Sequence, residues 1–443
     1  MLLLALATAI GLVLIQWGVG RRVLGRLPLA DDTWLERALL EIAAGTITTG
    51  LVLFGLAAVQ LYNPEVLRVL YGVGLLAVLI TDGRELLAQC GAGLLALSDQ
   101  EWSPIERAVL PVIVLFLGLV CFYAGAPTTT WDPLDYHYEL PRLWLLHGGF
   151  YKIDTLVYAH FPATTELHFG WLMATANDIA ANQYTILMLL GMLLAAVTLG
   201  VRYCSRQAAV VGLAALVGLP LIFTEQAQGG VIDCALTTFM LLALGRILRW
   251  ADTRDSRQAW LAALLAGGAV ATKHSGWLMG FFVVGVVLAV ALRERRWQQG
   301  IRQGAMLGCA IFVVGLPWYA KSALFTGNPV WPFADHLFNQ TPKGYADILY
   351  WSNPNFTRSL TNLITWWWEV TTHTSLTQYR FRLLTPVYLG LMPLLFGLFN
   401  KPGAHRTLLL FALLQCGLLL FQAPGEPRYM LTAWALLGML MAY

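Results

Sequence analysis

Long apolar stretches alternate with short polar connections along the whole chain. Apolar runs of 16 to 20 residues recur, and a helix of that length crosses a hydrocarbon core of about 30 Å. The pattern predicts an all-α, polytopic transmembrane helix bundle with about thirteen spans. The predicted spans are Leu2–Gly20, Ala38–Tyr62, Val66–Thr81, Ala108–Ala124, Tyr184–Val201, Ala208–Phe223, Val231–Leu244, Trp260–Ala271, Trp277–Leu292, Ala305–Trp318, Leu383–Phe399, Leu408–Phe421 and Tyr429–Tyr443.

Two of the connections are long, at residues 125–183 and 323–382. Within the first, Pro162–Thr175 has helical periodicity but contains Glu166 and His168. Such a helix suits the membrane surface better than its interior, so we expect a juxtamembrane helix here.

Two further segments are expected at the membrane surfaces. Trp366-Trp367-Trp368-Glu369 is typical of an interfacial aromatic belt. The run Glu85–Leu97 is weakly amphipathic, and we expect it to rest on the opposite surface. We find no repeat or separate soluble domain, and we interpret residues 1–107 as amino-terminal transmembrane helices of unknown role and residues 108–443 as the catalytic membrane domain.

Positive charge is distributed unevenly between alternate connections. Eighteen of the 28 Lys and Arg residues fall in the connections on one side of the predicted bundle, which the positive-inside rule assigns to the cytoplasm. The long connections then face outward. The eighteen residues are Arg21, Arg22, Arg26, Arg37, Arg84, Arg107, Arg202, Arg206, Arg246, Arg249, Arg254, Arg257, Arg293, Arg295, Arg296, Arg302, Lys401 and Arg406.

The composition supports this picture and narrows the classes of function. With 58% hydrophobic and 12% charged residues, the chain lies outside the range of soluble domains. Its formal charge of +3 does not suggest a nucleic-acid partner. The six cysteines form no CxxC pair, so neither a metal site nor a disulfide framework is indicated.

The stretch after the fourth predicted span, Trp131–Glu139, combines acids, aromatic rings and an imidazole. Because Pro133 disfavours a helical conformation at Asp132, we expect a turn and then a short helix from Asp135 onward. A carboxylate fixed at the membrane boundary is able to deprotonate an acceptor hydroxyl. The alternative is that both acids only cap the following helix. The residues beside them favour a functional interpretation.

The stretch Trp-Asp-Pro-Leu-Asp-Tyr-His-Tyr-Glu-Leu-Pro-Arg resembles the first outer loop of the GT-C superfamily. Within that superfamily it is most similar to the protein O-mannosyltransferase-like and aminoarabinose-transferase-like branch. The resemblance implies transfer of a sugar from a polyprenyl-phosphate donor, with the loop aspartate as base. Asp132 is then the base, and Asp135 is the alternative because many relatives have an acid where this chain has Pro133. The substrate-binding residues implied in this loop are Tyr136, His137, Glu139 and Arg142.

Three other places are similar to the same family. Lys273-His274-Ser275-Gly276 resembles a lysine-containing turn, and Lys273 would neutralise a phosphate or else snorkel to the interface. Arg428 and Tyr429 match an Arg-Tyr pair before the last helix; Arg428 would bind the donor phosphate or pair with Glu426. Asp233 starts the seventh span, where relatives often have an aspartate.

Other polar residues receive structural interpretations. Gly327–Phe333 resembles a turn of the same family, and we interpret it as structural. Glu225 is expected to be an ordinary loop residue. Six histidines are spread over the outer side without metal-ligand spacing, so no metal or other cofactor is indicated. They are His137, His160, His168, His274, His336 and His373.

The sequence therefore predicts an inverting glycosyltransferase in a bacterial inner membrane, with its site facing the periplasm. Its partners would be a polyprenyl-phosphate sugar, membrane lipids, and a lipid, glycan or protein acceptor. Asp132, Lys273 and Arg428 should open onto one cavity. One alternative, a lipid-linked glycan transporter or flippase, predicts ionisable groups deep within several helices. A second, an oligosaccharide polymerase or ligase, is kept open by outer arginines, namely Arg358, Arg380 and Arg382.

Overall fold

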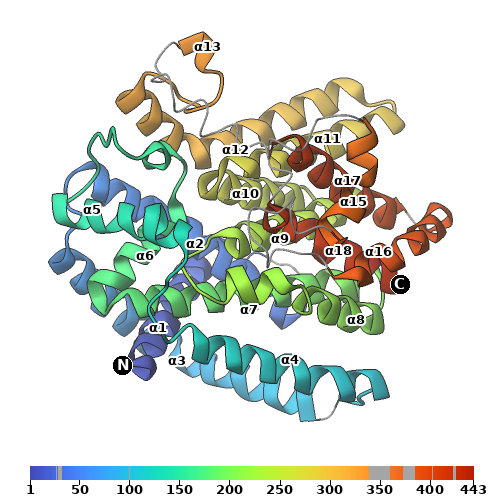
Figure 1. Cartoon of the computed structure of the whole chain (residues 1–443), viewed down its shortest axis with the longest axis horizontal. Coiled ribbons are helices and arrows are strands. Elements are labelled where there is room, and N and C mark those ends of the chain that lie inside the picture. Colours follow the sequence, from blue (N-terminus) through green and yellow to red (C-terminus); the bar gives the residue numbers. More distant parts are fainter. Residues whose placement is uncertain are drawn as a thin grey trace.

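The computed structural model describes residues 1–25, 27, 32–98, 100–338, 360–372, 385–401, 403–422 and 426–443. All regular secondary structure in these ranges is helical, as expected (Figure 1). Parts of the sequence interpretation depend on arginines that lie outside the described residues, namely Arg26, Arg358, Arg380 and Arg382.

Within the described residues, eight helices are long and apolar enough to cross a membrane. They identify an integral membrane protein. The eight helices are α1 (Leu2–Leu24), α2 (Trp34–Ala58), α3 (Pro64–Ser98), α4 (Pro104–Tyr123), α7 (Asp178–Tyr203), α9 (Asp233–Thr253), α11 (Trp277–Arg293, following the turn His274–Gly276) and α12 (Trp297–Thr326).

The remaining helices are shorter or only partly described. They are α5 (Glu139–His147), α6 (Thr164–Thr175), α8 (Arg206–Val217), α10 (Ser256–Thr272), α13 (Asp335–Phe338), α15 (Leu360–Thr372), α16 (Pro386–Leu391), α17 (Gly403–Gln422) and α18 (Leu431–Ala442), with the 3₁₀-helical segment η5 (Met392–Asn400) after α16. Every predicted span coincides with a helix. Five coincide with α8, α10, α16 with η5, α17 and α18, so the number of crossings stays a prediction.

The centre of the bundle is built around α9, the most enclosed of the spans. Helices α7 and α10 pack against it, and α1 and α2 pack together beside α7. At the crossing of α1 and α2, a Cβ atom on Gly45 would lie 1.6 Å from the carbonyl oxygen of Gln16, so only glycine fits. The first two helices thus share one core with later helices. The division at residue 107 stays a prediction.

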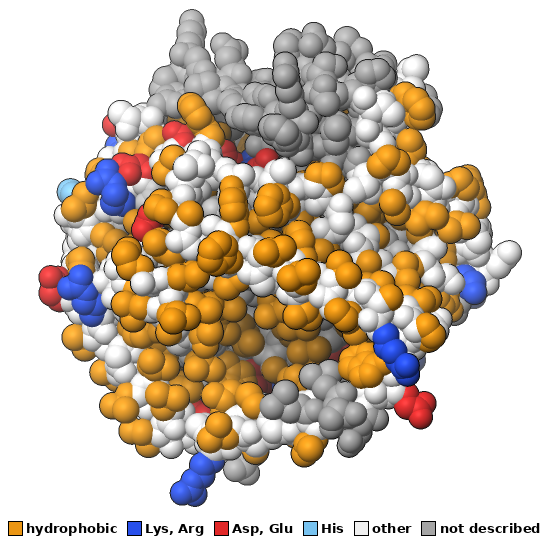
Figure 2. Space-filling view, turned by 60° about the horizontal axis from the view of Figure 1, so that its bottom comes forward, with side chains coloured by type: hydrophobic (Ala, Val, Ile, Leu, Met, Phe, Trp, Pro, Cys, Tyr) orange, Lys and Arg blue, Asp and Glu red, His pale blue; other side chains and the backbone are white. Residues whose placement is uncertain are grey.

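Helices α3 and α4 form one edge of the bundle (Figure 1). Helix α3 continues without a break through Glu85–Leu97, so this run belongs to a longer helix, and its place on a membrane surface stays a prediction. The sequence between Thr81 and Glu85 has no proline to end the helix. Most side chains of this pair are exposed. Figure 2 shows the same face of the molecule, which is covered mainly by hydrophobic side chains with charged ones toward its edges.

Helix α6 coincides with the juxtamembrane helix predicted at Pro162–Thr175, and it packs against other helices of the protein. Ten of its twelve residues are buried, because α2, α3 and α7 cover it. Its polar residues have partners inside the protein: Glu166 Oε1 lies 2.7 Å from His137 Nδ1, and His168 Nε2 lies 2.9 Å from Thr49 Oγ1. They therefore mark internal hydrogen bonds rather than exposure to water.

Two of the tryptophans of α15 pack inside the protein, and the position of this segment at the membrane interface stays a prediction. Trp366 is fully buried, with its ring parallel to that of Trp434 at a centroid distance of 6.3 Å. Trp367 meets Trp434 edge-on at 5.2 Å, and Trp368 is exposed. The side chain of Glu369 lies outside the described residues. Two of the three rings therefore hold α15 against α18.

The bundle has an arginine-rich end and an acidic-loop end. Helix α9 has 21 residues and is about 31 Å long; it starts at Asp233 and carries Arg246 and Arg249 in its last turns. At the arginine-rich end, Arg246 Nη1 lies 2.8 Å from Asp32, and Arg249 Nη2 lies 2.8 Å from Glu36. The predicted clustering of arginines at one end is thus observed. Which side of the membrane this end faces stays a prediction.

Replacing the buried carboxylate at this end, by Glu36→Gln, should lower the thermal midpoint of the detergent-purified protein by several degrees. Glu36 accepts from both Arg202 and Arg249, and removing one partner of a buried ion pair costs about 3 kcal/mol or more. The control is Asp154→Asn, which removes the exposed pair with Lys152, worth about 1 kcal/mol at most. Equal shifts in the two variants would contradict a structural role for Glu36.

Candidate functional site

The acidic stretch forms a π-helical turn, η1 (Pro133–His137), directly before α5. The backbone N–H of Tyr138 donates to the carbonyl of Pro133 at 2.9 Å, which is the five-residue spacing of a π-turn. Asp132 itself has helical angles, φ −56° and ψ −45°, so the expectation of a non-helical turn at Asp132 was wrong. Pro133 stands in the first turn, where its missing N–H breaks no hydrogen bond. Asp132 is therefore helical although proline disfavours this conformation in the residue before it.

Two contacts from the bundle fix this turn. The hydroxyl of Tyr138 donates to Asn182 Oδ1 at 2.5 Å, and Asn182 Nδ2 donates to the carbonyl of Ala126 at 2.8 Å. Gly230 packs directly against the turn with φ +76°, and a Cβ atom there would lie 2.6 Å from Pro133 Cβ. Only glycine meets both conditions.

Arg428, in the 3₁₀ turn η6 (Pro427–Met430) before α18, is buried and surrounded by three carboxylates. Its guanidinium pairs with Asp132, lies 3.3 Å from Glu225 Oε2, and lies 3.2 Å from Glu426 Oε2. Glu225 stands on a second π-turn, η3 (Ile222–Gln226), after α8. The prediction that Glu225 is an ordinary loop residue was therefore wrong.

A second ion pair lies beside the first. Lys273, at the end of α10, places Nζ 2.9 Å from Asp233 Oδ1 at the start of α9. The same Nζ lies 3.8 Å from the centre of the Tyr429 ring. The hydroxyl of Tyr429 lies 3.3 Å from Arg428 Nη2, so this ring connects the two pairs. We call the group Asp132, Glu225, Asp233, Lys273, Glu426, Arg428 and Tyr429 the charged cluster.

The pKa values of the two loop acids, Asp132 and Asp135, are shifted in opposite directions. Burial alone would raise the pKa of Asp132, but the neighbouring Arg428 holds this pKa below its ordinary value. Burial and the charge of Asp132 raise the pKa of Asp135 above its ordinary value. Burial alone would lower the pKa of Lys273, and the Asp233 carboxylate raises this pKa above its ordinary value. Asp132 is thus the more strongly ionised of the two loop acids.

Tyr136 and His137 lie behind Asp132. The ring of Tyr136 stacks on Tyr158 at a centroid distance of 4.1 Å and contacts the ring of His137 at 4.0 Å. His137 is buried, and its Nδ1 lies 2.7 Å from Glu166 of α6. Sequence analysis missed Glu166 as a partner of the site. The available signal was an acid inside an otherwise apolar helix, which needs a partner when buried.

Three predicted site residues are not brought to the charged cluster. Glu139 and Arg142 pair with each other along α5, with Arg142 Nε 2.7 Å from Glu139 Oε2. The two ring nitrogens of His274 lie 3.1 Å from the carbonyl of Trp331 and 3.3 Å from the hydroxyl of Tyr319. In the segment Gly327–Phe333, Asn328 bonds both Val330 and Phe333, which supports the structural interpretation of that turn.

A pocket of about 650 Å³ opens beside the turn. Asp132, Asp135, Glu225 and Arg428 are among its lining residues. Lys273 is not, so the expectation that it opens onto the same cavity as Asp132 was wrong; it lies behind the lining, in contact with Tyr429. Among the residues that the structure describes, no three His, Cys, Asp or Glu side chains are grouped to hold a metal ion.

Gly230→Ala should loosen the acidic turn, because the added methyl group overlaps Pro133 and the backbone is held at positive φ. We expect faster amide hydrogen exchange in the peptides that cover residues 126–140, together with a lower thermal midpoint. The control is Gly118→Ala on α4, where an added Cβ meets no atom within 4 Å. Unchanged exchange in Gly230→Ala would show that this contact does not hold the turn.

Comparisons with known proteins agree with this architecture. A sequence-family model described as a domain of unknown function (DUF8201) matches residues 161–434, a range that includes Asp233, Lys273 and Arg428 but not Asp132. No curated protein sequence matches the chain.

The crystal structure of ArnT from Cupriavidus metallidurans bound to undecaprenyl phosphate is similar, with a TM-score of 0.51 at 18% identity. The alignment covers 75% of this chain but only 59% of the ArnT chain. This likeness confirms the predicted GT-C type of fold. Because the family match extends over more than half of its length, the chain belongs to the family of the domain of unknown function DUF8201.

Proposed function

We propose that this protein is an inverting glycosyltransferase that moves a sugar from a polyprenyl-phosphate donor to an acceptor hydroxyl. The observation that supports it best is an ionised aspartate, Asp132, paired with a buried arginine, Arg428, at a pocket on the acidic-loop end. The fold is similar to that of ArnT, whose crystal structure contains undecaprenyl phosphate. The acceptor is a lipid, glycan or protein hydroxyl.

Asp132 acts as the general base in this proposal. The acceptor hydroxyl enters the pocket, gives its proton to the Asp132 carboxylate, and its oxygen bonds to the anomeric carbon as the bond to the phosphate oxygen breaks. Attack opposite the leaving group inverts the configuration at that carbon. The products are the glycosylated acceptor and a polyprenyl phosphate. Asp135 is the weaker candidate, because Asp132 is the loop acid that pairs with Arg428, the residue proposed to bind the donor phosphate.

Arg428 stabilises the leaving phosphate in this proposal, and Lys273, which does not line the pocket, adds positive charge from behind Tyr429. The charged cluster contains two cations and four carboxylates, so it is formally negative before any donor binds. A donor phosphate must therefore compete with Asp132 and Glu225 for the guanidinium of Arg428. When it succeeds, Asp132 loses the contact that lowers its pKa and becomes a stronger base. Donor binding and base activation are thereby coupled.

The aromatic and imidazole groups position the base. Glu166 fixes the ring of His137, and Tyr136 stacks between His137 and Tyr158. These contacts are rigid and lie behind Asp132. In the proposal they hold the carboxylate toward the pocket and take no part in the chemistry. Electrostatic groups fixed before the reaction contribute most to such catalysis.

Nothing in the structure favours the two alternatives. A flippase predicts ionisable groups deep within several helices, whereas the charged cluster and the arginine-rich end lie at helix ends. The polymerase or ligase alternative depends on Arg358, Arg380 and Arg382, which lie outside the described residues. The proposed reaction does not depend on the organism or on which side of the membrane the site faces. We keep an outward-facing site as part of the proposal.

Asp132→Asn should lower the release of undecaprenyl phosphate at least about 100-fold, because general-base catalysis contributes factors of that size. The measurement uses synthetic undecaprenyl-phosphate hexoses and pentoses, with a solubilised membrane extract as the source of acceptor. The matched variant Asp135→Asn in the same loop should lose less than about tenfold. Wild-type turnover in Asp132→Asn, at an unchanged thermal midpoint, would remove Asp132 from the mechanism; the reverse ranking would make Asp135 the base.

Glu225→Gln should increase the affinity for undecaprenyl phosphate about fivefold. A carboxylate near the phosphate opposes binding by about 1 kcal/mol when the pair is well solvated, and the variant removes that charge while keeping its shape. The control is Glu139→Gln, which makes the same charge change in a residue outside the charged cluster. Affinity is measured by titrating undecaprenyl phosphate against intrinsic tryptophan fluorescence. Weaker binding in Glu225→Gln would argue against a phosphate beside Arg428.

A further inference from the structure

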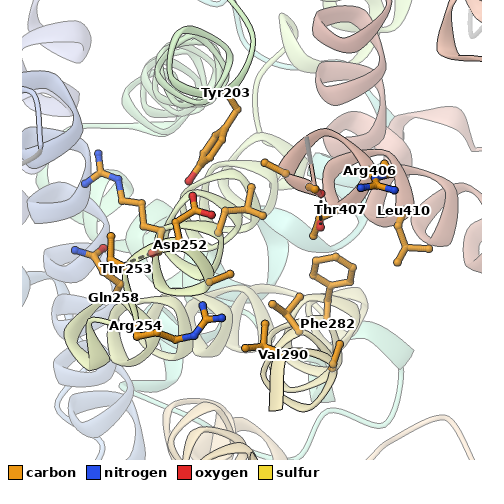
Figure 3. A pocket seen from close by; sticks show the side chains of 18 of the residues that line it. Tyr203, Asp252, Thr253, Arg254, Gln258, Phe282, Val290, Arg406, Thr407 and Leu410 are labelled. Atoms are coloured by element: carbon orange, nitrogen blue, oxygen red, sulfur yellow. Dashed lines mark hydrogen bonds between the residues drawn. The ribbon is translucent and has the colours of Figure 1, made fainter. Parts of the chain in front are cut away.

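A second pocket lies at the arginine-rich end and takes no part in the proposed reaction. Its volume is about 1560 Å³ (Figure 3). The helices that line it continue to the acidic-loop end: α9 starts at Asp233, and α10 ends beside Lys273. At 1.5 Å per residue the polar rim of this pocket lies roughly 25 Å along these helices from Asp233 and Lys273, whereas its apolar lining reaches Leu278 near the start of α11.

The pocket has a polar rim and an apolar wall. Figure 3 shows the rim residues Asp252, Arg254 and Gln258 from the connection of α9 and α10, facing Arg406 and Leu410 of α17. The wall runs along α11 and the first turns of α17. Its members are Leu278, Phe281, Phe282, Gly285, Val286, Ala289, Val290, Leu410 and Leu414.

The length of this wall matches one membrane leaflet. From Leu278 to Val290 it extends about 18 Å along α11, and one leaflet contributes about 15 Å of hydrocarbon. Phe281 is 70% exposed, and Leu410 is 52% exposed, so the wall is accessible. Phe282 meets Phe411 edge-on at 4.9 Å and closes the floor between α11 and α17. A groove of this depth suits an acyl chain and is too apolar for a water-soluble anion.

The charge at the mouth of the groove suits an anion. Six arginines and three carboxylates line the pocket, and carboxylates bind four of the arginines: Arg202 and Arg249 contact Glu36, Arg254 contacts Glu294, and Arg257 contacts Asp255.

The other two arginines are Arg293, at the end of α11, and Arg406, at the start of α17. Among the described residues, neither has a carboxylate partner. The remaining acid, Asp252, lies on the α9 side beside Tyr203, across the pocket from Arg406 (Figure 3). Positive charge is thus left at the top of the apolar wall.

We propose that this groove is a binding site for an anionic glycerophospholipid of the surrounding membrane. Its phosphate binds between Arg293 and Arg406, and one acyl chain lies along α11 and the start of α17. Basic pockets between transmembrane helices recognise anionic headgroups in this way. The site is separate from the transfer reaction and does not depend on the function proposed for the charged cluster.

The test compares lipid retention in three variants, using nanodiscs of phosphatidylcholine with a minor fraction of phosphatidylglycerol and native mass spectrometry of the released protein. The wild type should retain phosphatidylglycerol in preference to phosphatidylcholine. The double variant Arg293→Gln with Arg406→Gln should lose this preference at least about tenfold, since each arginine contributes about 1 kcal/mol to binding an anionic lipid. The matched control is Arg295→Gln with Arg296→Gln, which removes the same charge from the same end outside the pocket.

A steric variant tests the groove without changing its charge. A Cβ atom on Gly285 would meet no atom within 4 Å, and Gly285 lines the pocket, so Gly285→Trp adds a bulky ring to the groove. We expect it to lose phosphatidylglycerol as the double variant does, while Gly118→Trp on α4 retains it. Equal losses in both arginine double variants would show that general surface charge, and not this groove, retains phosphatidylglycerol. Full retention in Gly285→Trp would place the lipid elsewhere, and either result would overturn the proposal.

Discussion

A single buried guanidinium joins the parts of the chain that make the candidate site. Arg428 precedes the last helix, yet it binds Asp132 after α4, Glu225 after α8 and Glu426 beside it. A cation removed from water in this way is strongly unfavourable unless carboxylates surround it. The same contact therefore stabilises the fold at this end and keeps Asp132 ionised. In the proposed function, the donor phosphate competes with these carboxylates for Arg428.

The sequence predicted the helices well because the membrane imposes one simple rule. An apolar run of sufficient length has to be a helix, so every predicted span coincides with one. It failed where polar residues sit inside the protein. Glu166 and His168 were interpreted only as signs of a surface helix, and their partners within the bundle were missed. A periodic pattern does not distinguish a polar side chain facing water from one facing an internal partner.

The site was predicted in part, and the reason lies in backbone geometry. Asp132, Asp233, Lys273 and Arg428 come together as a family resemblance suggested, whereas Glu225 was missed. Both Asp132 and Glu225 are presented by π-helical turns. An extra residue in a turn rotates the following side chains and has no clear sequence signature. Pro133 even suggested the opposite conformation.

The distribution of charge links the two ends of the molecule. In a protein surrounded by lipid, ionisable side chains have a low free-energy cost only near the headgroups or beside a partner of opposite charge. Both situations are found in this chain. At the arginine-rich end acids hold most of the described arginines, which fixes the helices, and Arg293 and Arg406 are the two pocket arginines without a carboxylate partner among the described residues. At the acidic-loop end the acids outnumber the cations. The same helices, α9 and α10, connect a surplus of positive charge to a surplus of negative charge. This polarity suits a protein that is anchored by anionic lipids at one end and keeps a carboxylate base at the other.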